Sequence, residues 1–198
     1  PQLEIIVHAA ASWEEDPSSL LKTKEDLARA NMVLITLVFL EDHISAILPD
    51  LKKAREKCDL MLGLVSSKEI VNLTKMGGLD MSKPSSGVLK FLKKLRGDKN
   101  KVTGGEKQMA ILRQIPKVLK FIPGKAQDLR AYFLSMQYWL AGSEENIESL
   151  FCYLLSRYSS LHNSTKMEIK SPVEYPETGL YHPDLPKKIT ESISEIPF

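Results

Sequence analysis

The chain has 198 residues, of which 43% are hydrophobic and 26% are charged, an ordinary composition for a globular protein. With 27 Lys and Arg against 25 Asp and Glu, the net charge of +2 argues against a nucleic-acid-binding protein. The longest apolar run, Met32 to Leu40, is too short for a transmembrane segment. Two cysteines provide neither a disulfide framework nor a metal-binding spacing, so we expect a cytoplasmic protein.

Three apolar runs of strand length occur early in the chain, over Leu3–His8, Met32–Leu40 and Leu60–Val65. Such runs are typical of strands that are buried on both faces of a parallel sheet. Helical patterns separate them, over 18–30 and 44–51. This alternation predicts an α/β fold, with a partial, doubly wound, mostly parallel sheet from residue 1 to about residue 80. Three strands make a thin sheet, so we expect an earlier strand to be missing.

Pro49 interrupts the second helical pattern, and it predicts either a kink or a helix that begins there. We expect four regions in all: the partial α/β domain over 1–82, a basic helix and linker over 83–105, a helical region over 106–160, and a proline-rich extended tail over 161–198. The tail lacks a core of its own, so it must dock on another part of the protein to be ordered.

The helical region contains two apolar stripes, over 126–140 and 147–158. Gly142 is expected to end the first helix in the left-handed conformation, and Ser143 is expected to cap the second. The connection is short and both stripes need burial, so the two helices are expected to form an antiparallel pair.

The basic stretch from Lys83 to Lys101 has a local excess of six positive charges. It is either a docking patch for an acidic partner or ligand carboxylates, or a solvated face; the second is at least as common. Phe91 is the sole aromatic residue in it, which argues against single-stranded nucleic acid.

Two histidines follow expected strands, His8 at the end of the first and His43 just after the second. The carboxyl ends of strands are where a doubly wound sheet binds its ligands. With Glu41 and Asp42, these imidazoles would face a ligand crevice. The alternative, which we favour, is that both are loop histidines with local hydrogen bonds.

A second candidate site lies at the start of the helix over 126–140, where Lys125 and Arg130 place two cations near a helix N-terminus. Backbone N–H groups there can hold an anion, although Asp128 is better explained as a cap of the helix. Tyr132 and Trp139 would line a cavity for a flat ligand, but aromatic residues at helical spacing more often belong to the core. The sequence has no GxGxxG loop and no P-loop.

Three longer segments resemble a known family: Leu73–Pro84, Gly105–Asn146 and Val173–Pro186. They are similar to the large, porphyrin-binding subunits of magnesium chelatase from bacteriochlorophyll-making bacteria, and the related cobalt chelatase large subunits share the weaker parts. Such subunits are far longer than this chain, and the first residue is Pro1 rather than Met. The resemblance therefore implies an amino-terminal fragment that begins after the family's first strand.

The resemblance also implies a function. The family inserts Mg²⁺ into protoporphyrin IX during (bacterio)chlorophyll biosynthesis in the bacterial cytoplasm, a ligase reaction that forms nitrogen–metal bonds. Two partner subunits form the ATPase motor, so ATP, Mg²⁺ and the porphyrin belong to the whole complex, and no cofactor is expected in this chain. The metalation residues of the family lie beyond the matched segments. No catalytic or metal-binding residue can therefore be transferred, and the isolated chain should be inactive.

A porphyrin has an apolar disc and two propionates, so its site needs apolar walls and cations. Lys125 and Arg130, beside Tyr132 and Trp139, are candidates for that role. The histidines at 8 and 43 are further candidate contacts to a tetrapyrrole or a partner. Two alternatives remain: an interaction module that docks the ATPase subunits without binding a tetrapyrrole, and a self-contained enzyme that uses the two histidines.

Overall fold

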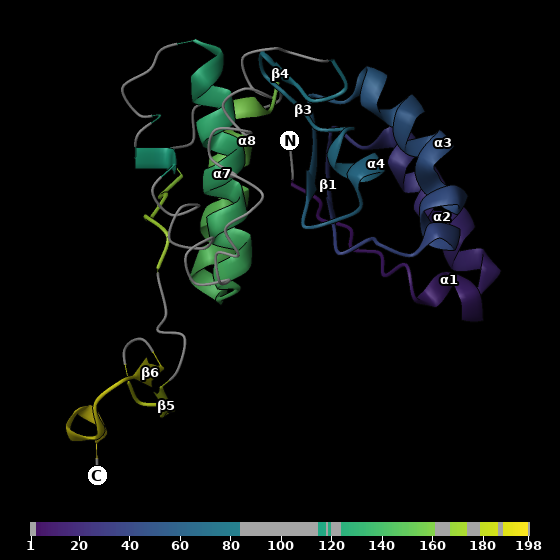
Figure 1. Cartoon of the computed structure of the whole chain (residues 1–198). Coiled ribbons are helices and arrows are strands. Elements are labelled where there is room, and N and C mark those ends of the chain that lie inside the picture. Colours follow the sequence, from purple (N-terminus) through teal and green to yellow (C-terminus); the bar gives the residue numbers. More distant parts are fainter. Residues whose placement is uncertain are drawn as a thin grey trace, which may run out of the picture.

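The computed structural model describes residues 3–83, 115–117, 119, 124–160, 167–173, 179–185 and 188–197. Helices cover both faces of a four-stranded sheet: α1 to α4 lie on one side, and α7 and α8 lie on the other (Figure 1). Each layer of helices shares a separate hydrophobic core with the sheet. The predicted α/β fold class is confirmed.

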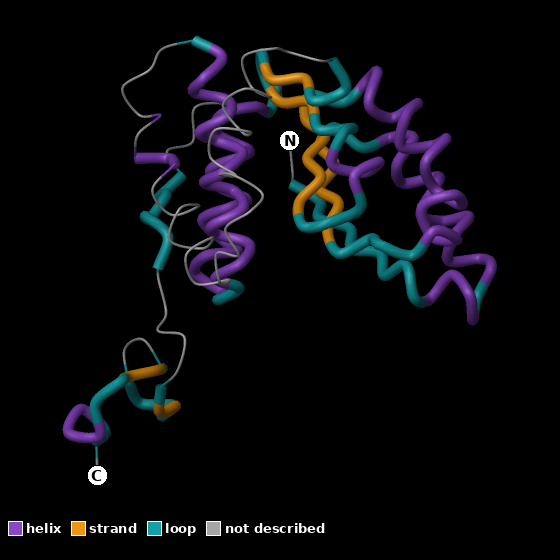
Figure 2. Tube along the Cα trace, viewed as in Figure 1, coloured by secondary structure: helices purple, strands orange, loops and turns teal. Residues whose placement is uncertain are grey.

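The sheet combines one parallel and two antiparallel pairs, in the order β1-β2-β3-β4 (Figure 2). Strand β1 (Met32–Thr36) runs parallel to β2 (Leu60–Leu64). Strands β3 (Lys75–Met76) and β4 (Leu79–Asp80) form a hairpin that extends the sheet beyond β2. A two-residue connection joins antiparallel strands, so the sheet is mixed.

The strand predicted over Leu3–His8 is wrong, because these residues are extended without joining the sheet. The segment lies along α2, where Glu4 contacts Arg29 at 3.4 Å and His8 contacts Asp26 at 2.9 Å. Its apolar side chains remain exposed. Within the described residues, β1 is the edge strand of the sheet and pairs only with β2. The segment over residues 3–8 does not pair with that edge, so the sheet does not bury it.

The first helical layer contains α1 (Ser12–Glu15), α2 (Pro17–Arg29), α3 (Glu41–Lys57) and α4 (Lys68–Val71). Helix α3 continues through the exposed Pro49, so the alternative of a helix that begins there is wrong. This layer packs on one face of the two parallel strands through the buried residues Val33, Ile35, Ile47, Leu51, Ala54, Met61 and Ile70.

The second layer is the predicted antiparallel pair, α7 (Lys125–Ala141) and α8 (Glu144–Tyr158). Gly142 ends α7 with φ 65°, and the Ser143 side chain accepts a hydrogen bond from the N–H of Asn146, so both predicted caps are confirmed. The pair packs on the other face of β2, and the shared core includes Leu60, Leu62, Leu64, Leu129, Tyr132, Phe133, Leu150 and Leu154.

The described part of the tail docks first on this helix pair. The buried Asn146 side chain donates to the Val173 carbonyl at 3.0 Å and accepts from the Val173 N–H at 2.9 Å. The chain then forms a small hairpin of β5 (Leu180–Tyr181) and β6 (Ile189–Thr190), followed by the 3₁₀ turn Ile193–Glu195. The basic stretch beyond Lys83, with the expected helix in it, lies outside the described residues.

The ion pair between Arg55 of α3 and Asp80 of β4 makes the free energy of unfolding depend on pH in the acid range. Burial acts to raise the pKa of Asp80, but hydrogen bonds from Ser82 and the charge of Arg55 outweigh it and lower the pKa to about 2. The unfolded carboxyl has a pKa of about 3.9, so its stabilisation is present above that value and is lost as pH falls toward 2. We expect Asp80→Asn to lower the free energy of unfolding at neutral pH, and the gap to wild type to close between about pH 4 and pH 2.

Urea unfolding at several pH values measures this gap, and Glu25→Gln, which changes an exposed carboxylate on α2, is the control. A gap that is as wide at pH 2 as at neutral pH would contradict the role of Asp80.

Candidate functional site

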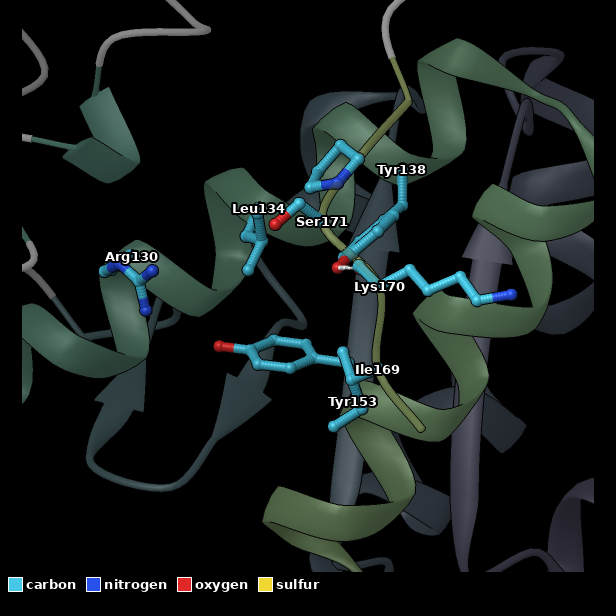
Figure 3. Close-up of a pocket in the computed structure, with 8 residues that line it drawn as sticks. Arg130, Leu134, Tyr138, Tyr153, Ile169, Lys170 and Ser171 are labelled. Atoms are coloured by element: carbon cyan, nitrogen blue, oxygen red, sulfur yellow. Dashed lines mark hydrogen bonds between the residues drawn. The ribbon is translucent and has the colours of Figure 1, made fainter. Parts of the chain in front are cut away.

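An open pocket of about 280 Å³ lies where the tail crosses the helix pair (Figure 3). One wall comes from α7, one from α8 and one from residues 169–172 of the tail. Its walls combine aromatic and aliphatic side chains with polar groups in nearly equal measure. The lining residues are Arg130, Leu134, Tyr138, Tyr153, Ile169, Lys170, Ser171 and Pro172.

Arg130 brings a fixed positive charge to this pocket. It lies in the second turn of α7, and its Nε donates to the carbonyl of Pro116 at 2.9 Å, which orients the guanidinium. The Lys170 side chain extends away from Arg130 (Figure 3). Lys170 instead contributes its backbone, because its carbonyl accepts a hydrogen bond from the Tyr138 hydroxyl.

Tyr153 carries a buried hydroxyl that has no hydrogen-bond partner in the described part of the chain. The hydroxyl points toward Arg130 (Figure 3). Burial raises the pKa of Tyr153, so the group stays protonated at neutral pH and can donate. A buried hydroxyl without an acceptor carries a free-energy cost, and a carboxylate that entered beside Arg130 would supply that acceptor. The arrangement therefore suits an anionic group.

Of the four helix residues predicted to contact a tetrapyrrole, the structure places only Arg130 in this pocket. Tyr132 is 5% exposed and belongs to the core, where its hydroxyl donates to the Gly63 carbonyl at 3.4 Å. Burial raises the pKa of Tyr132 to about 12. Trp139 is half-buried and packs against the same core, and the side chain of Lys125 lies outside the described residues. Their contact with a tetrapyrrole stays a prediction.

The two histidines have separate partners. His8 Nε2 lies 2.9 Å from a carboxylate oxygen of Asp26 on α2, and His43 Nε2 lies 3.0 Å from one of Glu14 on α1. The ring of His43 also makes an edge contact with Trp13. His8 lies in the extended segment before α1, whereas His43 lies in the first turn of α3 rather than in a loop. Their partners are 18 and 29 residues away in the sequence, and no contact joins the two histidines within the described residues.

Asp128 is a structural residue whose role the sequence did not reveal. We predicted a cap of α7, but its carboxylate accepts from the Gly78 N–H at 2.8 Å and from the Tyr158 hydroxyl at 2.8 Å. Arg157 lies 3.6 Å from the same carboxylate. Asp128 thus joins the β3–β4 turn to the end of α8, and its partners are too distant in sequence to give a local signal.

Metal-binding clusters and membrane-spanning helices are both absent from the described residues. No group of three or more His, Cys, Asp or Glu side chains there is placed to bind a metal ion. Within the same ranges, no helix combines the length and the apolar character that crossing a membrane requires.

Comparison with known proteins covers almost the whole chain. Residues 1–133 match the family model described as Domain of unknown function (DUF3479), and residues 136–197 match the model described as CobN/Magnesium Chelatase. The boundary between the two models falls inside α7.

Curated relatives are similar along the full length. The magnesium-chelatase H subunit of Cereibacter sphaeroides is 52% identical over all 198 residues, and that of Rhodobacter capsulatus is 50% identical over the same span. The chloroplastic magnesium-chelatase ChlH protein of Oryza sativa subsp. japonica is 31% identical over 162 residues, which are 81% of this chain and 12% of that protein. The chain spans only 17% of the length of each of the two bacterial relatives.

Proposed function

Because the chain belongs to the DUF3479 family and matches magnesium-chelatase H subunits along its whole length, we propose that it acts as the amino-terminal part of such a subunit. The complete complex would insert Mg²⁺ into protoporphyrin IX in the cytoplasm, with ATP hydrolysis by two partner subunits, as a ligase of (bacterio)chlorophyll biosynthesis. This chain would bind or position porphyrin and would carry out no metalation by itself. The full-length identity of 52% is the observation that carries the proposal.

The Arg130 pocket gives this role a physical basis. A volume of about 280 Å³ is at the lower limit for small-molecule sites. It suits a propionate arm rather than a whole macrocycle. Arg130 would pair with the carboxylate and Tyr153 would donate to it, while the disc would rest on another surface.

Titration of the 198-residue chain with protoporphyrin IX tests this role, with Trp139 quenching as the signal because Trp139 lies on α7. We expect Arg130→Ala to weaken binding about tenfold, which corresponds to the loss of one charge-assisted hydrogen bond. Tyr153→Phe should have a smaller effect in the same direction. Arg29→Ala, which removes an exposed arginine from α2, is the matched control.

The dimethyl ester of protoporphyrin IX separates the carboxylate from the disc. It should bind wild type and Arg130→Ala equally, since it carries no negative charge for the arginine to pair with. Unchanged affinity of Arg130→Ala for the free acid would remove this residue from the site.

The second candidate function is an interaction module that docks the ATPase subunits and binds no tetrapyrrole. The small size of the pocket favours it, because a volume of about 280 Å³ does not hold a macrocycle. Absence of porphyrin quenching, together with co-purification of the chain with the ATPase subunits, would support this candidate over the first. Metalation by the isolated chain would contradict both.

A further inference from the structure

The chain leaves strand β1 through an exposed apolar loop, residues 37–40, which we call the β1 loop. Leu37, Phe39 and Leu40 are 62%, 57% and 59% exposed. The sequence predicted that the strand would continue to Leu40, but it ends at Thr36. Contiguous exposed side chains of this size are unusual on a protein surface and often mark an interaction site.

The β1 loop is held in an unfavourable backbone conformation. Leu37 has φ 59°, and Val65, which follows the neighbouring strand β2, has φ 43°. Left-handed φ values are rare for residues other than glycine and are unfavourable, most of all for a β-branched residue. Two backbone hydrogen bonds hold the loops together, Leu37 N–H to Val65 O at 3.0 Å and Ser67 N–H to Val38 O at 2.9 Å. These two hydrogen bonds therefore fix the position of the loop that carries the exposed side chains.

Carboxylates surround one side of this apolar surface. Glu41 and Asp42 are exposed and begin α3 directly after Leu40, and neither has an ion-pair partner in the described part of the chain. Glu14 of α1 is 69% exposed and reaches the same helix end through its 3.0 Å contact with His43. The start of α3 and helix α1 lie side by side (Figure 1). The result is an apolar centre with an acidic rim on the side of α1 and α3, while the exposed Lys68 follows Ser67 on the side of α4.

We propose that the β1 loop docks a protein partner whose contact segment has an apolar centre flanked by Lys or Arg. Charge complementarity selects this occupant, because a second copy would place like charges against each other. Propionates and anionic lipid headgroups would be repelled by the same rim. The surface is distinct from the Arg130 pocket, which lies between the two helices on the other face of the sheet, so the proposal stands independently of porphyrin binding.

A synthetic 14-residue peptide of alternating Leu and Lys, labelled for fluorescence anisotropy, is a suitable probe for the 198-residue chain. Trp13 emission provides a second signal, since its ring centroid lies 5.8 Å from that of His43 at the rim. We expect binding that weakens as salt rises, and at least a fivefold loss of affinity in the double variant Phe39→Ser, Leu40→Ser. Ile193→Ser, which removes a side chain that is 68% exposed far from the loop, should bind like wild type.

Charge is tested separately with Glu41→Gln, Asp42→Asn, which should reduce both the affinity and its salt dependence. Equal binding of a Leu/Glu peptide, or full binding by the double serine variant with an unchanged circular dichroism spectrum, would overturn the proposal. Concentration-dependent dimerisation that is abolished by Phe39→Ser would assign the loop to a second copy and would also overturn it.

Discussion

We expect Gly63→Ala to lower the free energy of unfolding by about 2–3 kcal/mol, although it adds a single methyl group. Gly63 lies in the buried strand β2, and a Cβ there would stand 2.7 Å from the carbonyl oxygen of Ile70 and 3.1 Å from the Cα of Val71. Both atoms belong to the backbone of α4, so no side-chain rotation relieves the contact. Either α4 or the strand must move, and the sheet on both sides is packed.

Gly142→Ala is the matched control. Its Cβ would have open space, with the Trp139 carbonyl oxygen 3.8 Å away, but Gly142 has φ 65°. This variant therefore reports left-handed strain alone, which costs about 1 kcal/mol. Urea unfolding followed by circular dichroism compares the two. If Gly63→Ala proved no more destabilising than Gly142→Ala, the close approach of α4 to β2 would be refuted.

The elements that could be predicted are those whose signals are local. Strand β2 is a continuous apolar run, and it is buried along its whole length. The end of α7 and the start of α8 depend on Gly142 and Ser143, whose cap preferences follow from φ and from a hydroxyl acceptor. Such features need no knowledge of the rest of the fold.

The errors concern residues whose state depends on distant partners. The run Leu3–His8 has the composition of a strand, but a strand is buried only where a neighbour pairs with it. The stripe over 126–140 predicts one buried face for α7, but Leu140, at its end, is 42% exposed, and Tyr138, which lies off the stripe, is 1% exposed. Tyr138 is buried because α7 contacts the tail as well as the shared core, so more than one of its faces is covered.

The candidate site was only partly visible in the sequence. Arg130 was found because a cation near the start of a helix is a recognisable pattern. Tyr153 and the tail residues 169–172 were not, because the pocket forms only when the tail returns across the helix pair. The chemistry of the pocket depends on side chains from α7, α8 and the tail that lie together only in the folded protein. The spacing of residues within one of these segments therefore cannot predict it.

We expect Asp128→Ala to lower the free energy of unfolding by about 3 kcal/mol, because one carboxylate serves three elements. Its loss leaves the Gly78 N–H and the Tyr158 hydroxyl without their acceptor, and removes the countercharge of Arg157. The Asp128 side chain is only 16% exposed, so water replaces it poorly. Glu56→Ala, which removes an exposed carboxylate from α3, should change stability by less than about 0.5 kcal/mol.

A double-mutant cycle with Tyr158→Phe distinguishes a specific bond from a general effect of charge. If the 2.8 Å bond between the Tyr158 hydroxyl and the carboxylate stabilises the fold, the two losses overlap, and the coupling should be about 1–2 kcal/mol. Additive losses would instead show that the carboxylate stabilises the fold through its other partners, the Gly78 N–H and Arg157. Because Asp128 lies on α7 and Tyr158 at the end of α8, coupling would mean that this bond holds the two helices of the pair together.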